Sequence, residues 1–204
     1  MSFKQNLLLS YCLIIASLVG LTSSCTGKSN HGRSSPSEKK ETLDYQDVYN
    51  DVADVLSESS YDHGSYAPII MRMAWHSSAT YDIVTDTGGS NGATMRFCPE
   101  KNYPPNIGME NARNRLEPIY QKYSAAGLTY SDLWTLAGVC AIQETGGPKV
   151  PWRGGRKDRQ AKDSPPDGRI PNPRNGADHL RKVFYRMTFN DQVYLFIFFK
   201  LLVV

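Results

Sequence analysis

Cysteine is scarce in this chain, and its four copies are badly placed for a disulfide framework. Cys12 lies inside an N-terminal apolar run and Cys25 lies just after it, so only Cys98 and Cys140 remain in the body of the sequence. Small secreted domains that depend on disulfides carry many more cysteines for their length. The sequence therefore allows at most one bridge in the body and favours two free thiols.

An excess of charge of one sign is also missing. The chain carries 23 lysines and arginines against 20 aspartates and glutamates, a net charge of +3 over 204 residues. Nucleic-acid-binding domains usually concentrate far more positive charge on one face. The glycine-rich stretches lack the Lys-Ser or Lys-Thr ending of a phosphate-binding loop. We therefore expect no nucleic-acid partner and no nucleotide site.

A long hydrophobic run is absent as well. Residues 7–21 are apolar and follow a single lysine, Lys4, but they are fewer than the about 20 residues that a membrane-spanning helix needs. These features are typical of a signal peptide or a signal anchor, and both remain open for residues 1–25. An anchor would attach the protein to a membrane. Residues 26–42 are polar and serine-rich, which predicts a disordered linker.

Helical periodicity begins at Leu43 and recurs along the rest of the chain. Apolar residues at three- and four-residue steps predict helices over about 43–56, 67–77, 109–123, 130–145 and 178–187. Pro118 is expected to bend or end the third helix, Thr129 to start the fourth, and Asp178 to cap the last. No alternating strand pattern appears. We therefore expect an all-α body with a long loop rich in Pro, Gly and Arg over 147–177.

The second of these helices carries a cluster of chemical groups. Arg72 and His76 are four residues apart and share a helix face, with Trp75 beside them. A guanidinium, an imidazole and an indole in one patch suit the cleavage of a polar bond next to a flat apolar ligand. On these three residues alone, ordinary helix packing explains the pattern equally well.

The sequence around this helix closely resembles the haem peroxidases of the intracellular class, which includes cytochrome c peroxidase and ascorbate peroxidase. The matching segments are 68–82, 87–97, 132–138, 147–153, 155–158, 167–171 and 178–181, and the resemblance covers about residues 45–192. The run Gly-Gly-Ser-Asn-Gly-Ala-Thr-Met-Arg-Phe, which ends at Phe97, is most similar to cytochrome c peroxidases. The resemblance implies the all-α haem peroxidase fold and a haem b cofactor.

The resemblance also implies roles for individual residues. His76 matches the distal histidine, which takes a proton from hydrogen peroxide and returns it to the leaving oxygen. Arg72 matches the arginine that stabilises negative charge on that oxygen, and Trp75 matches the indole that stacks over the haem. Asn106 matches the residue that orients the distal histidine, and Glu100 matches the residue that holds this asparagine. The expected haem contacts are Pro68, Ile69, Arg72, Trp75, Pro171 and Asn172, although the family often has aspartate at the last position.

The resemblance ends near Gln192. Family members continue with a helix that supplies the proximal histidine ligand of the haem iron, whereas no histidine follows His179 in this chain. Residues 193–204 instead form a nearly uncharged apolar tail, too short to span a membrane, and its abrupt start suggests a translated intron or a mispredicted gene model. Residues 43–192 are therefore expected to form only the distal half of a peroxidase domain.

The function implied by the resemblance is reduction of hydrogen peroxide in response to oxidative stress, with cytochrome c as the electron donor. Two alternatives remain open: a truncated, non-catalytic product that lacks the proximal ligand, and a peroxidase that oxidises ascorbate or another small reductant. The N-terminal leader favours the secretory pathway or a membrane. The alternative location is the mitochondrial intermembrane space, where cytochrome c is found.

Overall fold

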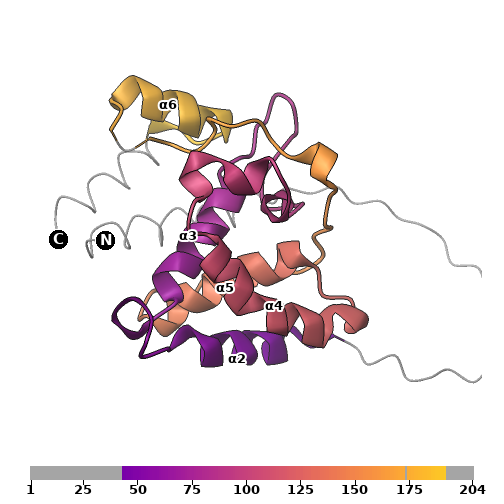
Figure 1. The fold of residues 1–204 in the computed structure, drawn as a ribbon. Coiled ribbons are helices and arrows are strands. Elements are labelled where there is room, and N and C mark those ends of the chain that lie inside the picture. The colour runs from indigo at the N-terminus through magenta and orange to yellow at the C-terminus, as the bar shows by residue number, and fades with distance from the viewer. Residues whose placement is uncertain (1–42, 173, 192–204) are drawn as a thin grey trace, which may run out of the picture.

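The computed structural model describes residues 43–172 and 174–191. This part of the chain contains five α-helices: α2 (Tyr45–Leu56), α3 (Ala67–Ser78), α4 (Glu110–Tyr123), α5 (Tyr130–Glu144) and α6 (Ala177–Arg186) (Figure 1). Short 3-10 helices lie between them at Asp62–Gly64, Thr94–Arg96, Glu100–Asn102, Pro104–Asn106, Ser124–Ala126 and Ala161–Asp163. The described residues form no β-strand, only isolated bridges between Ser57 and Ser65 and between Asp82 and Thr87. The all-α prediction is confirmed.

Three predicted segments lie outside the described residues: the leader 1–25, the linker 26–42 and the apolar tail 193–204. Within the described ranges, no helix is both long enough and apolar enough to cross a membrane.

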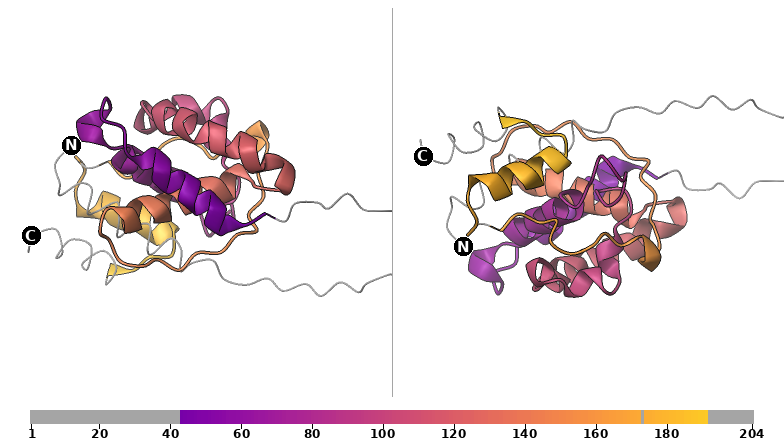
Figure 2. Two further views of the ribbon diagram at one scale, coloured as in Figure 1. Left: turned by 90° about the horizontal axis from the view of Figure 1, so that it is seen from below. Right: turned by 90° about the horizontal axis from the view of Figure 1, so that it is seen from above.

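Helix α5 is the centre of the core. Every residue from Ser131 to Ile142 is buried, and α2, α3 and α4 all pack against this helix. Figure 1 shows α2 at one end of the molecule and α6 at the other, with α3 running between them. The segment between α5 and α6 is extended and runs along the outside of the helices (Figure 2).

The helix ends that the sequence marks most clearly are formed as expected. The side chain of Thr129 accepts a hydrogen bond from the backbone N–H of Asp132 at 3.1 Å, which caps the start of α5. The helix ends before Gly146, which adopts a left-handed conformation (φ 86°) that glycine takes at little cost. Cys98 and Cys140 are free thiols, the first exposed and the second buried, as predicted.

The structure contradicts two predicted helix ends: Pro118 does not end the third helix, and Asp178 does not cap the last one. Pro118 lies inside α4, which continues to Tyr123; Pro118 and Asn114 are exposed, so the Asn114 carbonyl that loses its helical donor can be hydrated. Asp178 does not cap α6. The helix begins one residue earlier, at Ala177, and the Asp178 carboxylate lies in its first turn, 3.3 Å from the Arg181 guanidinium.

Candidate functional site

Helix α3 carries Arg72, Trp75 and His76 close together at the core. Pro68 lies in its first turn, where a missing N–H costs nothing. Trp75 is 5% exposed and His76 is 7% exposed, whereas Arg72 is half-buried. A base, a cation and an aromatic ring therefore meet on one stretch of helix, largely shielded from water.

The imidazole of His76 is held by an asparagine from a loop 30 residues away. The Nδ1 atom of His76 lies 3.0 Å from Oδ1 of Asn106, which is itself 2% exposed. The side-chain amide of Asn106 donates to the backbone carbonyl of Glu100 at 2.9 Å. Because this bond occupies the amide nitrogen, the amide oxygen must face the imidazole. The network thus assigns the proton of His76 to Nδ1 and leaves the lone pair on Nε2.

Burial keeps this imidazole neutral. The pKa of His76 is lowered from its ordinary value of 6.5 to about 4, chiefly because the ring is removed from water. The hydrogen bond with Asn106 offsets part of this fall, and the positive charge of Arg72 adds a smaller lowering effect. At neutral pH, His76 is therefore a free base that can accept a proton at Nε2.

The same loop also positions Arg72. Its guanidinium donates to the backbone carbonyl of Pro105 at 2.8 Å, and burial lowers its pKa from the ordinary value. Pro105 immediately precedes Asn106 in the 3-10 helix Pro104–Asn106, so two consecutive residues orient the guanidinium and the imidazole. No role of Pro105 was expected from the sequence, and its place in the Pro-Pro-Asn turn is the sequence feature that could have indicated one.

Glu100 is close to the site, but it contacts Asn106 through its backbone carbonyl and not through its carboxyl group. The side chain is 2% exposed, and its Oε2 atom has no hydrogen-bond partner among the described residues. Burial raises the pKa of this carboxyl, and a hydrogen bond with Thr94 offsets part of the rise. A protonated carboxyl is cheaper to bury than a carboxylate, which explains the choice of the backbone atom as the acceptor.

An aromatic side chain from α6 lies against Trp75. The rings of Trp75 and Phe184 are stacked at an interplanar angle of 25°, with their centroids 6.2 Å apart. The ring centroids of Phe184 and Phe189 are 6.0 Å apart. Phe184 lies in the last predicted helix, and its contact with the indole appears only in the folded chain.

Arg186 fastens α6 to the end of α3. Its guanidinium donates to the backbone carbonyls of Ala79, Thr80 and Tyr81, just beyond the last turn of α3, and to that of Arg169. Burial and the charge of Arg169 lower the pKa of Arg186 to about 10. This arginine, which the sequence analysis had not singled out, fixes the position of the helix that carries Phe184.

The remaining expected contact residues lie apart from this group. Ile69 is half-exposed in the first turn of α3, beside Pro68. Pro171 and Asn172 lie in the loop before α6. The backbone N–H of Asn172 donates to Nε2 of His179 at 2.9 Å, and its side chain accepts from the backbone N–H of Arg174. No hydrogen bond of the described residues joins this loop segment to Arg72 or His76.

The arrangement fits one face of a haem group. An indole, a guanidinium and a neutral imidazole suit the face on which peroxide is cleaved. In the two described ranges, no group of three or more His, Cys, Asp or Glu side chains could hold a metal ion. His63 is exposed on an outer turn, and Nε2 of His179 accepts a hydrogen bond from the backbone N–H of Asn172.

Comparisons with known proteins agree with this geometry. Residues 48–195 match the model of the peroxidase family. Mitochondrial cytochrome c peroxidase from Pyricularia oryzae is 57% identical over 76% of the chain and 42% of its own length. The proteins of the same name from Neurospora crassa and Emericella nidulans are 57% and 55% identical, each over 73% of the chain and 41% of its own length. The chain thus spans about two fifths of the length of these curated relatives.

Proposed function

Because this chain belongs to the peroxidase family, we propose that residues 43–192 form the distal half of a haem peroxidase that reduces hydrogen peroxide. The observation that supports this function best is the tautomer of His76, fixed by Asn106 with Nε2 as the proton acceptor. Haem b, the cofactor that the family implies, would rest against Trp75, Pro68 and Ile69. When bound, haem supplies the iron at which the peroxide is cleaved.

The residues of this chain would move the proton in that reaction. Reduction of one hydrogen peroxide consumes two electrons and two protons and gives two waters. Nε2 of His76 would accept a proton from one oxygen of hydrogen peroxide and deliver it to the other oxygen, which leaves as water. Arg72 would stabilise the negative charge that builds on this leaving oxygen while the O–O bond breaks. With a pKa of about 4, protonated His76 is a strong enough acid to release the proton again.

The test is haem binding and peroxide cleavage by the full chain. We expect added haemin to give a Soret band and to quench tryptophan fluorescence, and Trp75→Phe to lose most of this quenching while Trp152→Phe keeps it. With imidazole supplied as an external iron ligand, His76→Leu should slow peroxide cleavage by about 10²–10⁴-fold. His63→Leu, a change at an exposed histidine, is the matched control. Equal rates in the His76 and His63 variants would refute the role of His76.

We also propose cytochrome c as the electron donor and the mitochondrial intermembrane space as the location, with a role in the response to oxidative stress. The names of the relatives support the donor and the organelle. Ascorbate is the alternative donor. Oxidation of ferrocytochrome c at a higher rate than ascorbate by the haemin-loaded chain, together with co-purification of the native protein with mitochondria, is the expected result.

A second candidate is a non-catalytic product. It is favoured by one observation: in the described residues, His63 is exposed, Nε2 of His179 accepts a backbone hydrogen bond, and no group of side chains could hold a metal ion. This candidate predicts no Soret band in the haemin titration, with or without imidazole. A haem spectrum that responds to peroxide would exclude it.

A further inference from the structure

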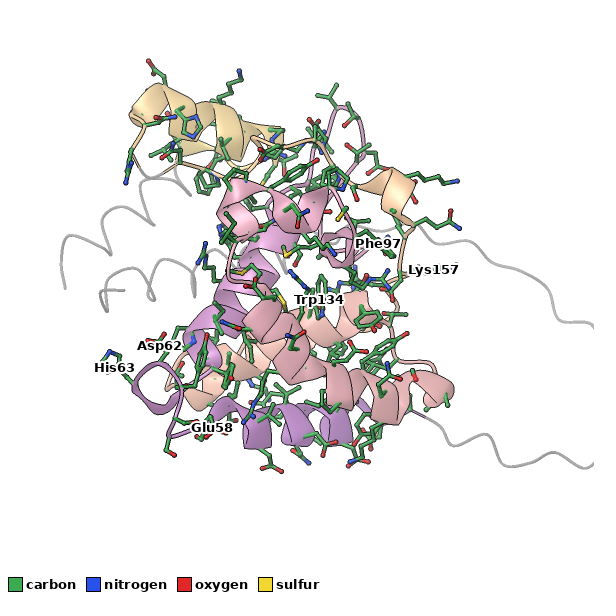
Figure 3. All side chains as sticks on the ribbon, in the orientation of Figure 1. Glu58, Asp62, His63, Phe97, Trp134 and Lys157 are labelled. Atoms are coloured by element: carbon green, nitrogen blue, oxygen red, sulfur yellow. The ribbon has the colours of Figure 1, made fainter. Side chains whose placement is uncertain are left out.

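Outside the α3 site, a cluster of aromatic rings surrounds Tyr130, the first residue of α5. Its ring is stacked on that of Tyr120 in α4, with centroids 3.5 Å apart and an interplanar angle of 16°. The ring of Trp134, one turn further along α5, lies edge-on to Tyr130 at 6.1 Å. Trp134 is 2% exposed and lies in the interior of the molecule (Figure 3), whereas both tyrosines are half-buried. The three rings therefore lead from the core toward the surface.

The phenol of Tyr130 donates its proton to a carboxylate. Its oxygen lies 3.0 Å from Oε1 and 3.1 Å from Oε2 of Glu117 in α4. Glu117 also accepts a hydrogen bond from Gln121, but among the described residues it takes part in no ion pair. Burial and the hydrogen bond to Glu117 raise the pKa of Tyr130. The phenol therefore keeps its proton at neutral pH, with a proton acceptor already in hydrogen-bond contact.

Other tyrosine–carboxylate pairs in the structure lack one of these features. Tyr45 donates to Asp132 at 2.6 Å, but Asp132 also accepts from two backbone N–H groups and from the Arg156 guanidinium. Tyr49 donates to Glu144, and its ring has no aromatic neighbour among the described ring contacts. The Tyr130 pair combines a carboxylate without a cationic partner with a stack of aromatic rings.

We propose that Tyr130 is a redox-active site that gives up one electron while its proton passes to Glu117. The phenol and the carboxylate become a neutral tyrosyl radical and a carboxylic acid, and the electron reduces the oxidant. The oxidant is an oxidising equivalent produced when hydrogen peroxide is reduced, so this proposal rests on the proposed function. Trp134 receives this oxidising equivalent in the core, and Tyr120 passes the oxidising equivalent from Tyr130 toward the surface. A small one-electron reductant such as a phenol restores the site.

The carboxylate is what makes the step feasible. A phenol that has lost an electron is a strong acid, so a base in hydrogen-bond contact avoids a charged radical. A nearby cation acts against the step: the Arg96 guanidinium lies 4.5 Å from the Tyr130 ring centroid and 4.7 Å from that of Phe97. Its charge is partly balanced by Asp158 at 3.8 Å. Replacement of Arg96 by glutamine should therefore make Tyr130 easier to oxidise.

The experiment delivers the oxidant next to this cluster without haem or peroxide. Cys98 follows Phe97 in the chain and is an exposed free thiol, so a ruthenium–bipyridine complex can be attached there in a full-length chain carrying Cys12→Ser and Cys25→Ser. A laser flash with an oxidative quencher then produces ruthenium(III). We expect a tyrosyl radical by optical absorption and electron paramagnetic resonance, lost in Tyr130→Phe and kept in Tyr185→Phe, a change at an exposed tyrosine on α6.

Glu117→Gln is the decisive variant, because glutamine keeps the shape and a hydrogen-bond acceptor but is not a base. We expect radical formation to slow by about 10²-fold and to become dependent on buffer base. Equal radical yield in the parent and in Tyr130→Phe, or an unchanged rate in Glu117→Gln, would overturn the proposal. Circular dichroism confirms that each variant is folded. A failed haemin titration, by contrast, would refute the peroxidase proposal and leave this result standing.

Discussion

His76 is buried as a neutral imidazole, so the stability of the folded chain must depend on pH at this residue. Its folded-state pKa of about 4 lies below the unfolded value of 6.5. Above pH 6.5 the imidazole is neutral in both the folded and the unfolded chain, so its burial carries no protonation cost. As pH falls below 6.5, the unfolded chain binds a proton at this residue and the folded chain does not. Stability is therefore lost between pH 6.5 and 4.

The size of the loss follows from the two pKa values. At about pH 4.5, the unfolded chain is almost fully protonated at this histidine and the folded chain is mostly unprotonated, which costs about 2.5 kcal/mol. His76→Gln removes this titrating group, so the variant should keep only the part of the pH dependence that comes from the other titrating groups. Between about pH 7.5 and 4.5, the free energy of unfolding should therefore fall by about 2.5 kcal/mol more in the parent than in the variant.

Urea unfolding of the full chain, followed by near-UV circular dichroism at both pH values, measures this difference. His63→Gln, the same replacement at an exposed histidine, is the matched control. Parallel pH dependence in the parent and in His76→Gln, to within about 0.5 kcal/mol, would refute the argument that burial sets the proton affinity of this ring.

Three further predictions concern the groups around the site. Arg186→Met should lower the free energy of unfolding by about 3 kcal/mol, because four backbone carbonyls lose a charged donor; chemical denaturation measures it, and a loss below about 1 kcal/mol would contradict it. Asn106→Leu should remove the acceptor that keeps the His76 proton on Nδ1, so that ¹⁵N NMR shows a mixture of both neutral tautomers; a single unchanged tautomer would contradict the assigned network. Gly154→Ala should cost about 1–3 kcal/mol in thermal unfolding, because its Cβ would lie 2.5 Å from the Tyr45 ring; an unchanged melting temperature would show that the loop moves freely.

The helices of this fold are predictable from local sequence because the forces that form them are local. Apolar spacing marks Val48, Val52 and Leu56 on the buried face of α2, and the Thr129 cap marks the start of α5. The errors at Pro118 and Asp178 come from the same local rules: α4 continues through an exposed proline, and Asp178 lies in the first turn of α6, where its carboxylate contacts Arg181. The placement of Arg72 next to His76 likewise follows from helix geometry alone.

The orientation of these side chains was beyond local rules. The residues that fix His76 and Arg72 come from a loop about 30 residues away, and they use backbone carbonyls of Pro105 and Glu100 that any residue type could offer. The family resemblance assigned Glu100 as the residue that holds Asn106, whereas in the fold its backbone carbonyl makes this contact and its carboxyl group is buried. A residue type signals a role only when its side chain makes the contact.

Arg186 shows the same limit at a longer range, and it links the fold to the chemistry. The carbonyls of Ala79, Thr80 and Tyr81 lie just beyond the last turn of α3, and all three accept hydrogen bonds from the Arg186 guanidinium. This contact from α6 brings Phe184 against Trp75, although Arg186 and Ala79 are 107 positions apart in the sequence. Helix α6, which Arg186 bonds to the end of α3, therefore borders the Trp75 indole on which a haem would rest. The orientation of the distal residues and the placement of α6 should consequently change together in any variant that breaks this contact.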